Sequence, residues 1–175
     1  VDISLLLKDR ANTTPAVASV PIPPGRSTRI IDILGSLLPG NNAALGIRFC
    51  FGTALVNSRS YNTASKCGGT YGMQVPALSP EKALSSSVRG VFHHLTYSPV
   101  ASAGSRVNIG FANASSMNAN VVVRLYGDSG ALLGTRTRAL KAFEHMQFTD
   151  IYRSVGAPAV ATGFATVDVT TPGAV

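Results

Sequence analysis

The stretch Val121–Asp150, VVVRLYGDSGALLGTRTRALKAFEHMQFTD, decides how the rest of this chain is interpreted. Its apolar residues alternate with polar ones, which is typical of a strand with one buried face. The segment Gly127–Gly130 then supplies the residues that a tight reversal needs. A second run, a bend and a third run follow. The stretch therefore predicts three strands in succession, the first two forming a hairpin.

The same plan recurs 118 residues earlier, at Ile3–Asp32, without a gap. One unbroken register across about five elements predicts an internal repeat; the alternative is a chance match of two β-rich segments. The positions that coincide are Val121 with Ile3, Val123 with Leu5, Leu125 with Leu7, Leu140 with Ile22, Phe148 with Ile30, Asp150-Ile151 with Asp32-Ile33, Ser154 with Ser36, Ala165 with Ile47 and Val167 with Phe49.

A unit of 118 residues does not fit twice into 175 residues, so we expect about one and a half units. The small, polar segment Ala77–Ser87 is the one candidate linker. It divides the chain into 1–84, which would lack its first strands, and 85–175, which would lack its last. The chain also opens inside a predicted strand, without an initiator Met or a signal peptide, which favours an excised or trimmed piece of a longer protein.

Composition favours an all-β protein with a polar, weakly charged surface. Charged residues make up 13% of the chain, about half the usual share. Such surfaces are commoner on secreted and cell-surface modules than on cytosolic enzymes. No apolar run reaches the roughly 18 residues that span a bilayer, and the basic residues behind the net charge of +7 are scattered rather than aligned. We therefore expect neither a membrane span nor a nucleic-acid partner.

Two aspartates precede predicted helical turns at equivalent positions of the two units. Asp32 comes before Ile33-Leu34, and Asp150 comes before Ile151-Tyr152. A carboxylate at the first position of a helix accepts backbone N–H groups, so both are predicted to be helix caps. Each unit is thus expected to be an antiparallel β-sandwich closed at one end by a short helix.

The second unit resembles a known family. The matching residues follow the pattern N-x-G-x-x-N, a polar loop, V-x-V-x-L-Y, a glycine turn and a short D-[IV]-[FY] helix; they are Asn108, Gly110, Asn113, Val121, Val123, Leu125, Tyr126, Gly130, Asp150, Ile151 and Tyr152. This pattern is similar to tandem immunoglobulin-like repeats of secreted or surface-attached bacterial proteins. Asp128 stands one place later than the usual Asp. Leu55–Asn62 and Gly69–Leu78 resemble the closing strands of such a repeat. The resemblance implies a fold and an extracellular setting, and transfers no catalytic or ligand residues.

The two cysteines, Cys50 and Cys67, would close a short loop if they paired. A disulfide across about 15 residues contributes roughly 3 kcal/mol in the chain-entropy model. Two separate thiols are the equal alternative. Two cysteines without a neighbouring histidine are too few for a structural zinc site.

Other reactive groups have simpler explanations. His93 and His94 are adjacent, so in a strand their side chains point to opposite faces, and His145 lies far along the chain. Asp128 with Asn113, Asn118 and Asn120 offers oxygens for calcium, but turn formation explains these residues better. No G-x-S-x-G elbow and no close carboxylate pair is present. The sequence therefore predicts no enzyme, no metal and no cofactor.

The leading functional prediction is a non-catalytic structural, spacer or adhesive module of a secreted or surface protein. Neighbouring repeats would be its partners, and an unpaired sheet edge would favour strand exchange or self-association. The alternative is a carbohydrate- or other ligand-binding module that uses exposed loop residues: Arg59, Tyr61, Tyr71 and Tyr97. A hydrolase accessory or inhibitory domain is a third hypothesis, and a viral coat jelly roll also fits the composition.

Overall fold

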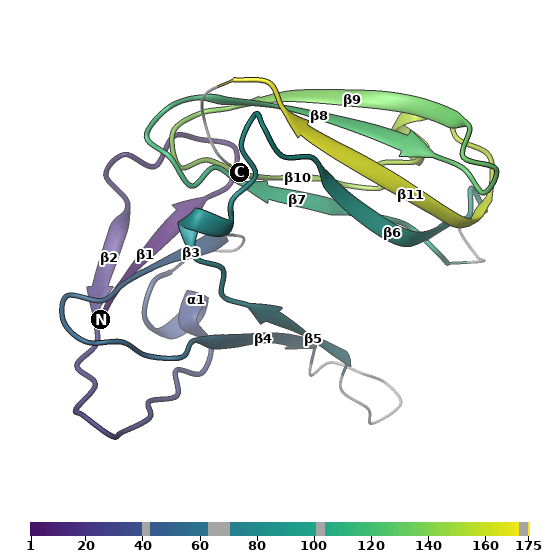
Figure 1. Ribbon diagram of the computed structural model, residues 1–175. Coiled ribbons are helices and arrows are strands. Elements are labelled where there is room, and N and C mark those ends of the chain that lie inside the picture. Colours follow the sequence, from purple (N-terminus) through teal and green to yellow (C-terminus); the bar gives the residue numbers. More distant parts are fainter. Residues whose placement is uncertain (40–42, 63–70, 101–103, 172–174) are drawn as a thin grey trace.

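A computed structural model describes residues 1–39, 43–62, 71–100, 104–171 and 175 of the chain (Figure 1). Antiparallel strands dominate these residues, as predicted. The elements in chain order are β1 (Asp2–Leu7), β2 (Ala16–Ser19), α1 (Ile33–Ser36), β3 (Ala43–Arg48), β4 (Asn57–Asn62), β5 (Tyr71–Pro76), the 3-10 helix η1 (Pro80–Lys82), β6 (Gly90–Tyr97), β7 (Ile109–Ala112), β8 (Ala119–Tyr126), β9 (Leu132–Leu140), β10 (His145–Phe148), the 3-10 helix η3 (Arg153–Val155) and β11 (Val160–Val169).

The C-terminal part consists of two sheets packed face to face (Figure 1). The four-stranded sheet has the order β6-β11-β8-β9, and β7 pairs with β10 to form the second layer. Strand β8 lies between β11 and β9, and its alternate residues Val121, Val123 and Leu125 are fully buried. Successive side chains of a strand point to opposite faces, which explains this alternation. We call the four-stranded layer the C-terminal sheet.

A close approach inside the C-terminal part requires glycine at position 163. The buried Tyr152 hydroxyl donates a hydrogen bond to the carbonyl oxygen of Tyr126, at 3.0 Å. A Cβ on Gly163 would lie 2.5 Å from that oxygen and 2.6 Å from the hydroxyl. Any larger residue would therefore displace the tyrosine that anchors the end of the core.

The N-terminal part contains a smaller sheet of order β2-β1-β3, which we call the N-terminal sheet. Its central strand β1 buries Ile3 and Leu5, which pack with Leu38 near α1. Strands β4 and β5 form a separate hairpin. The order β2-β1-β3 matches β9-β8-β11: in both cases the first strand is central, the second pairs on one side and a later strand pairs on the other.

The predicted register of the later strand is wrong by four residues. An offset of 118 aligns Ile47 with Ala165, but Ile47 pairs with Ile3, and the residue paired with Val121 is Val169. The difference comes from the lengths of the connections. A shift of four residues, an even number, leaves each side chain on the same face of the sheet. The alternation between buried and exposed residues is therefore unchanged.

Among its described residues, the N-terminal part also has no counterpart of β10. The sequence predicts a strand at 27–31, but these residues form none, and Ile22 and Ile30 are 37% and 36% exposed. Pro21, Pro23 and Pro24 precede this segment. Proline donates no ladder hydrogen bond and fixes the backbone, so no strand continues through the residues just before 27–31.

The predicted helical turns form, but the aspartates do not cap them with their side chains. Asp32 and Asp150 have left-handed backbones, with φ of 52° and 48°. A side-chain cap needs an extended backbone at that position. Instead, the carbonyl oxygen of Asp32 accepts the N–H of Ser36, and that of Asp150 accepts the N–H of Ser154. The Asp150 carboxylate forms an ion pair with Arg153 at 2.8 Å.

Candidate functional site

The structure places three of the four residues predicted to bind a ligand on one hairpin and the fourth in the core of the C-terminal part. Tyr97 is 3% exposed and stacks on Tyr152, with ring centroids 5.7 Å apart. It is therefore a core residue, and its prediction as an exposed loop aromatic is wrong: it is the last residue of β6 and points inward. Arg59 lies in β4, and Tyr61 and Tyr71 occupy paired strands of the β4–β5 hairpin, where Asn62 pairs with Tyr71. The side chains of Tyr61 and Tyr71 lie outside the described residues.

The disulfide stays a prediction. Cys50 is exposed, and its thiol lies 3.5 Å from the Asp2 carboxylate, to which it donates. Cys67 lies outside the described residues. The pKa of Asp2 is lowered, first by the hydrogen bond from Ser19 and then by that from Cys50.

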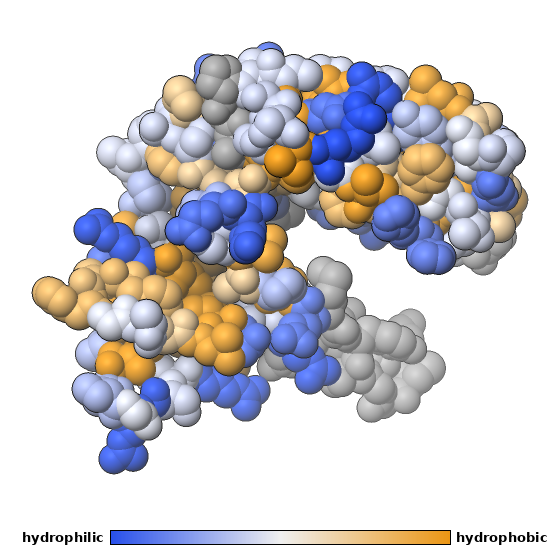
Figure 2. All heavy atoms as spheres, in the orientation of Figure 1, coloured by the Kyte–Doolittle hydropathy of each residue, from blue (hydrophilic) through white to orange (hydrophobic). Residues whose placement is uncertain are grey.

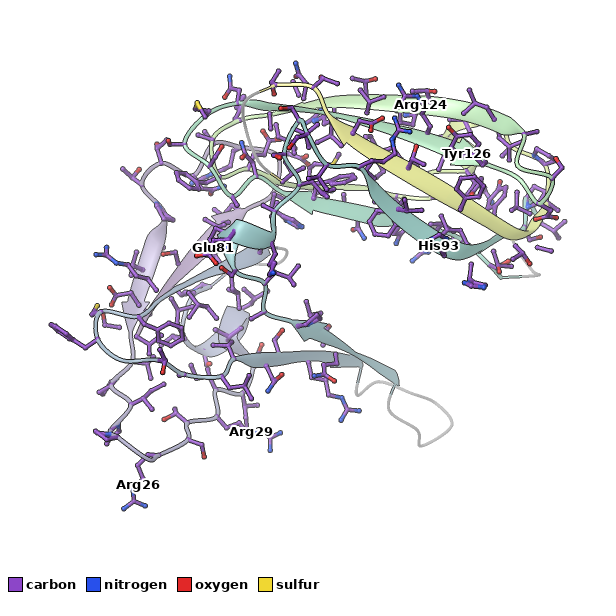
Figure 3. All side chains as sticks on the ribbon, in the orientation of Figure 1. Arg26, Arg29, Glu81, His93, Arg124 and Tyr126 are labelled. Carbon is purple, nitrogen blue, oxygen red and sulfur yellow. The ribbon has the colours of Figure 1, made fainter. Side chains whose placement is uncertain are left out.

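Within the described ranges, no three His, Cys, Asp or Glu side chains come together in a way that would hold a metal ion. No helix in that part of the chain is long and apolar enough to cross a membrane. Basic residues are dispersed: Arg26 and Arg29 lie on the loop between β2 and α1, far from Arg124 on the C-terminal sheet (Figure 3).

The structure brings together two segments that the sequence did not connect. The loop Lys8–Asn12, after β1, lies against Arg138 and the turn Lys141–His145, which leads into β10. We call this contact the joint, because it links the N-terminal sheet to the C-terminal part. Lys8 forms a parallel bridge with His145, and the Asp9 N–H donates to the His145 carbonyl oxygen at 2.8 Å. The loop thus extends the outer edge of β10.

Asn12 holds the joint from the N-terminal side. Only 4% of it is exposed, and its side-chain oxygen accepts the N–H of Leu7 at 2.9 Å. Its amide donates to the carbonyl oxygens of Leu7, Arg10 and Phe143, the last at 2.9 Å. Its backbone N–H donates to Ala142. One buried side chain therefore fixes its own loop and attaches that loop to the other part of the molecule.

Glu144 and Arg138 form the charged side of the joint. Glu144 is 1% exposed; its carboxylate accepts the Lys141 N–H at 2.8 Å and pairs with Arg138 at 3.2 Å. Arg138 also lies 3.4 Å from Asp9. A buried carboxylate is costly unless hydrogen bonds and a cation compensate it, and both are present here. The ion pairs link the loop, the turn and β9.

Asn113 supports the same turn from the opposite side. It is fully buried, and its amide donates to the carbonyl oxygens of Met117 and Lys141 at 2.7 and 2.8 Å. Its backbone N–H donates to the Glu144 carbonyl oxygen. The turn itself needs a left-handed backbone at Phe143, with φ of 53°. Asn12 of the N-terminal part and Asn113 of the C-terminal part thus hold the same turn.

His145 adds a titratable group to the joint. Its Nδ1 is buried and has no hydrogen-bond partner among the described residues. Burial lowers the pKa of His145, the nearby Lys8 lowers it further, and Asp9 opposes both. The neutral imidazole is therefore the form that the joint accommodates.

A second polar cluster lies on the outer face of the C-terminal sheet. Asp168 accepts hydrogen bonds from Arg89, at 2.7 Å from Nε, and from Arg124. The pKa of Asp168 is lowered, and the hydrogen bond from Arg89 makes the largest contribution. Beside it, the half-buried rings of Tyr126 and Phe164 stack with centroids 4.5 Å apart. Figure 3 shows Arg124 and Tyr126 on this sheet.

No protein-family model, no curated protein and no solved structure matches the chain, so a function can be inferred only from the geometry described above.

The sequence contained little sign of the joint. Asn12 lies in a loop rich in turn residues, and a lone glutamate between Phe143 and His145 gives no sign that it is buried.

Proposed function

We propose that the chain is a non-catalytic structural module of a secreted or surface protein, built from two related immunoglobulin-like units whose relative orientation is fixed by the joint. The observation that carries this proposal is the joint itself. Asn12 donates to the Phe143 carbonyl oxygen, and Arg138, which pairs with the buried Glu144, also pairs with Asp9, so these groups attach one part of the chain to the other. A spacer or adhesive arm needs such a connection, because its function depends on holding its ends at a defined distance.

Two features support relatedness of the units. The three-strand order β2-β1-β3 matches β9-β8-β11. Left-handed backbone positions also coincide at the offset of 118 residues: Gly25 with Phe143, at φ of 69° and 53°, and Asp32 with Asp150. Such positions are uncommon for residues other than glycine. Their agreement is independent of the apolar pattern that first indicated the repeat.

The interior polar groups support a structural task. Asn12, Asn113 and Glu144 are the most deeply buried polar side chains in the described residues, and each is occupied by backbone hydrogen bonds or an ion pair. A catalytic group needs freedom to exchange protons or electrons with a substrate. These three residues instead secure loops and turns.

Ligand binding is the second candidate, and the Tyr126–Phe164 pair favours it. The stacked rings lie beside Arg124 on a sheet face that no other described strand covers. Aromatic rings next to hydrogen-bonding groups suit a carbohydrate. Binding on a glycan array that Tyr126→Ala removes, together with an unchanged fold, would favour this candidate; Arg59→Ala tests the β4–β5 hairpin in the same assay.

Solution scattering tests the structural proposal. The intact chain should scatter as one rigid particle with the dimensions of the structure. Asn12→Ala leaves Phe143 and Leu7 without their side-chain partner, so this variant should show a broader distribution of distances. Asn118→Ala is the matched control, because Asn118 is an exposed turn residue. A flexible wild-type chain, or an Asn12→Ala profile identical to that of the control, would contradict the proposal.

A further inference from the structure

The outer edge of β3 is an unpaired strand edge. β3 pairs with β1 over six consecutive residues, Ala43–Arg48, without a bulge. On its other side, its backbone forms no hydrogen bond with any residue in the described ranges. An unpaired row of N–H and C=O groups is a template for another strand.

The other outer edges of the two larger sheets carry features that block such pairing. β2 has only four residues and lies between Pro15 and Pro21. β9 presents Arg136 and Arg138. β6 is bulged, with His94 at φ of 56° and two register shifts against β11. Short length, proline, charge and bulges are the known means of protecting an edge.

β3 has none of these features along its first five residues. Its sequence, AALGIR, contains small or apolar residues and a single charge at the end. Beyond it, Phe51 and Leu55 are 97% and 90% exposed. Figure 2 shows apolar side chains at the surface of the N-terminal part. Phe51 and Leu55 belong to the segment that follows β3 in the chain, so apolar side chains are exposed next to the end of this strand.

The C-terminal sheet indicates in which direction a partner strand would run along β3. In the matching order of strands, β3 corresponds to β11, since both flank the central strand on the same side. The outer edge of β11 is occupied by β6, which runs antiparallel to it. This edge of the three-strand arrangement thus accepts an antiparallel strand.

We propose that β3 pairs antiparallel with β3 of a second copy of this chain. The two N-terminal sheets would then join into one six-stranded sheet across a two-fold axis, which is the commonest symmetry of homo-oligomers. The strand is compatible with itself. With Gly46 opposite Gly46 of the second copy, as a two-fold axis through an antiparallel pair requires, Arg48 lies opposite Ala44, so no like charges meet. Within the chain, β4 and β5 pair with each other and do not reach this edge.

Sedimentation over a range of protein concentrations, with two lysine variants, tests the pairing. Gly46, Ser4 and Val17 form one row across the N-terminal sheet, so Gly46→Lys and Val17→Lys place the same charge on the same face at opposite edges. A Cβ on Gly46 would lie 3.5 Å from the Ser4 Cβ, an ordinary contact, so the fold should tolerate it. We expect a wild-type dimer that Gly46→Lys weakens at least about tenfold and that Val17→Lys leaves unchanged.

A wild-type chain that stays monomeric at millimolar concentration would overturn the proposal. So would a dimer that survives Gly46→Lys, or one that Val17→Lys weakens equally. Hydrogen exchange of the wild-type chain gives a second measurement that needs no variant. The amides of β3 should become more protected as the protein concentration rises, while those of β2 do not change; equal protection of β3 at low and high concentration would contradict the pairing.

Discussion

The N-terminal and C-terminal sheets arrange three strands in the same order, around β1 in one case and β8 in the other. Their cores differ greatly. Sixteen buried residues of the described chain cluster in the C-terminal part, whereas three do so in the N-terminal part. The difference follows from the second layer: β7 and β10 cover the inner face of β8, whereas a four-residue helix and its neighbours cover that of β1. Equal strand order therefore does not give equal stability, because burial needs two layers.

Core truncation should give the largest effect and the clearest contrast. Leu125 and Leu5 are the buried leucines of the central strands β8 and β1, and they are 0% and 3% exposed. We expect Leu125→Ala to cost about 4 kcal/mol and Leu5→Ala about 2 kcal/mol, because the thinner core collapses more easily around a cavity. Urea unfolding followed by circular dichroism measures both. Equal losses would contradict the contrast.

Strands β11 and β3, which flank the central strand of their sheets, should respond in opposite ways when a glycine is replaced by alanine. Gly163 of β11 has two oxygen atoms within 2.6 Å of the position of a Cβ, whereas Gly46 of β3 has nothing closer than 3.5 Å. Gly163→Ala should therefore cost about 2 kcal/mol. Gly46→Ala should be neutral or stabilising by about 0.5 kcal/mol, since alanine restricts the unfolded chain. Thermal unfolding of the two variants would distinguish them.

Acid should weaken the connection between the two parts through His145. Its pKa is lowered in the folded protein, so below its ordinary value of 6.5 the unfolded chain binds more protons than the folded chain. Stability is thus fully present above pH 6.5 and falls as the pH drops toward the folded value. His145→Gln should reduce this slope, measured by unfolding at several pH values. His93→Gln, on β6, is the control (Figure 3), and an equal change in both variants would exclude His145 as the cause.

The smallest effects should come from one half-buried carboxylate in each sheet, Asp168 and Asp2. Asp168 is paired with two arginines, and Asp2 accepts hydrogen bonds from the neutral side chains of Ser19 and Cys50. Both have lowered pKa values, so their stabilisation is present near neutral pH and is lost as the pH falls through the folded value. Asp168→Asn should reduce stability slightly, and Asp2→Asn less, in unfolding measurements at neutral pH. Solvent screening keeps both effects small.

Much of the architecture followed from the sequence because strand alternation is a local property. The residues of β8 and β1 were placed correctly, and so were the short helical turns after Asp32 and Asp150. The register of β11 was wrong because the length of the connection before a strand determines which of its residues pair with the central strand. An alignment of the two units without gaps cannot take a difference in that length into account. The joint was missed for another reason: Asn12 and Phe143 lie 131 residues apart, and no local pattern reports such a contact.

One measurement tests the central claim most directly, namely that the joint makes one rigid body of two related units. Residual dipolar couplings of backbone amides report the orientation of each strand in a single weakly aligned sample. We predict that the amides of β1 and β3 and those of β8 and β11 fit one alignment tensor with the structure. Two tensors of different magnitude would show that the units move independently, and would contradict the account.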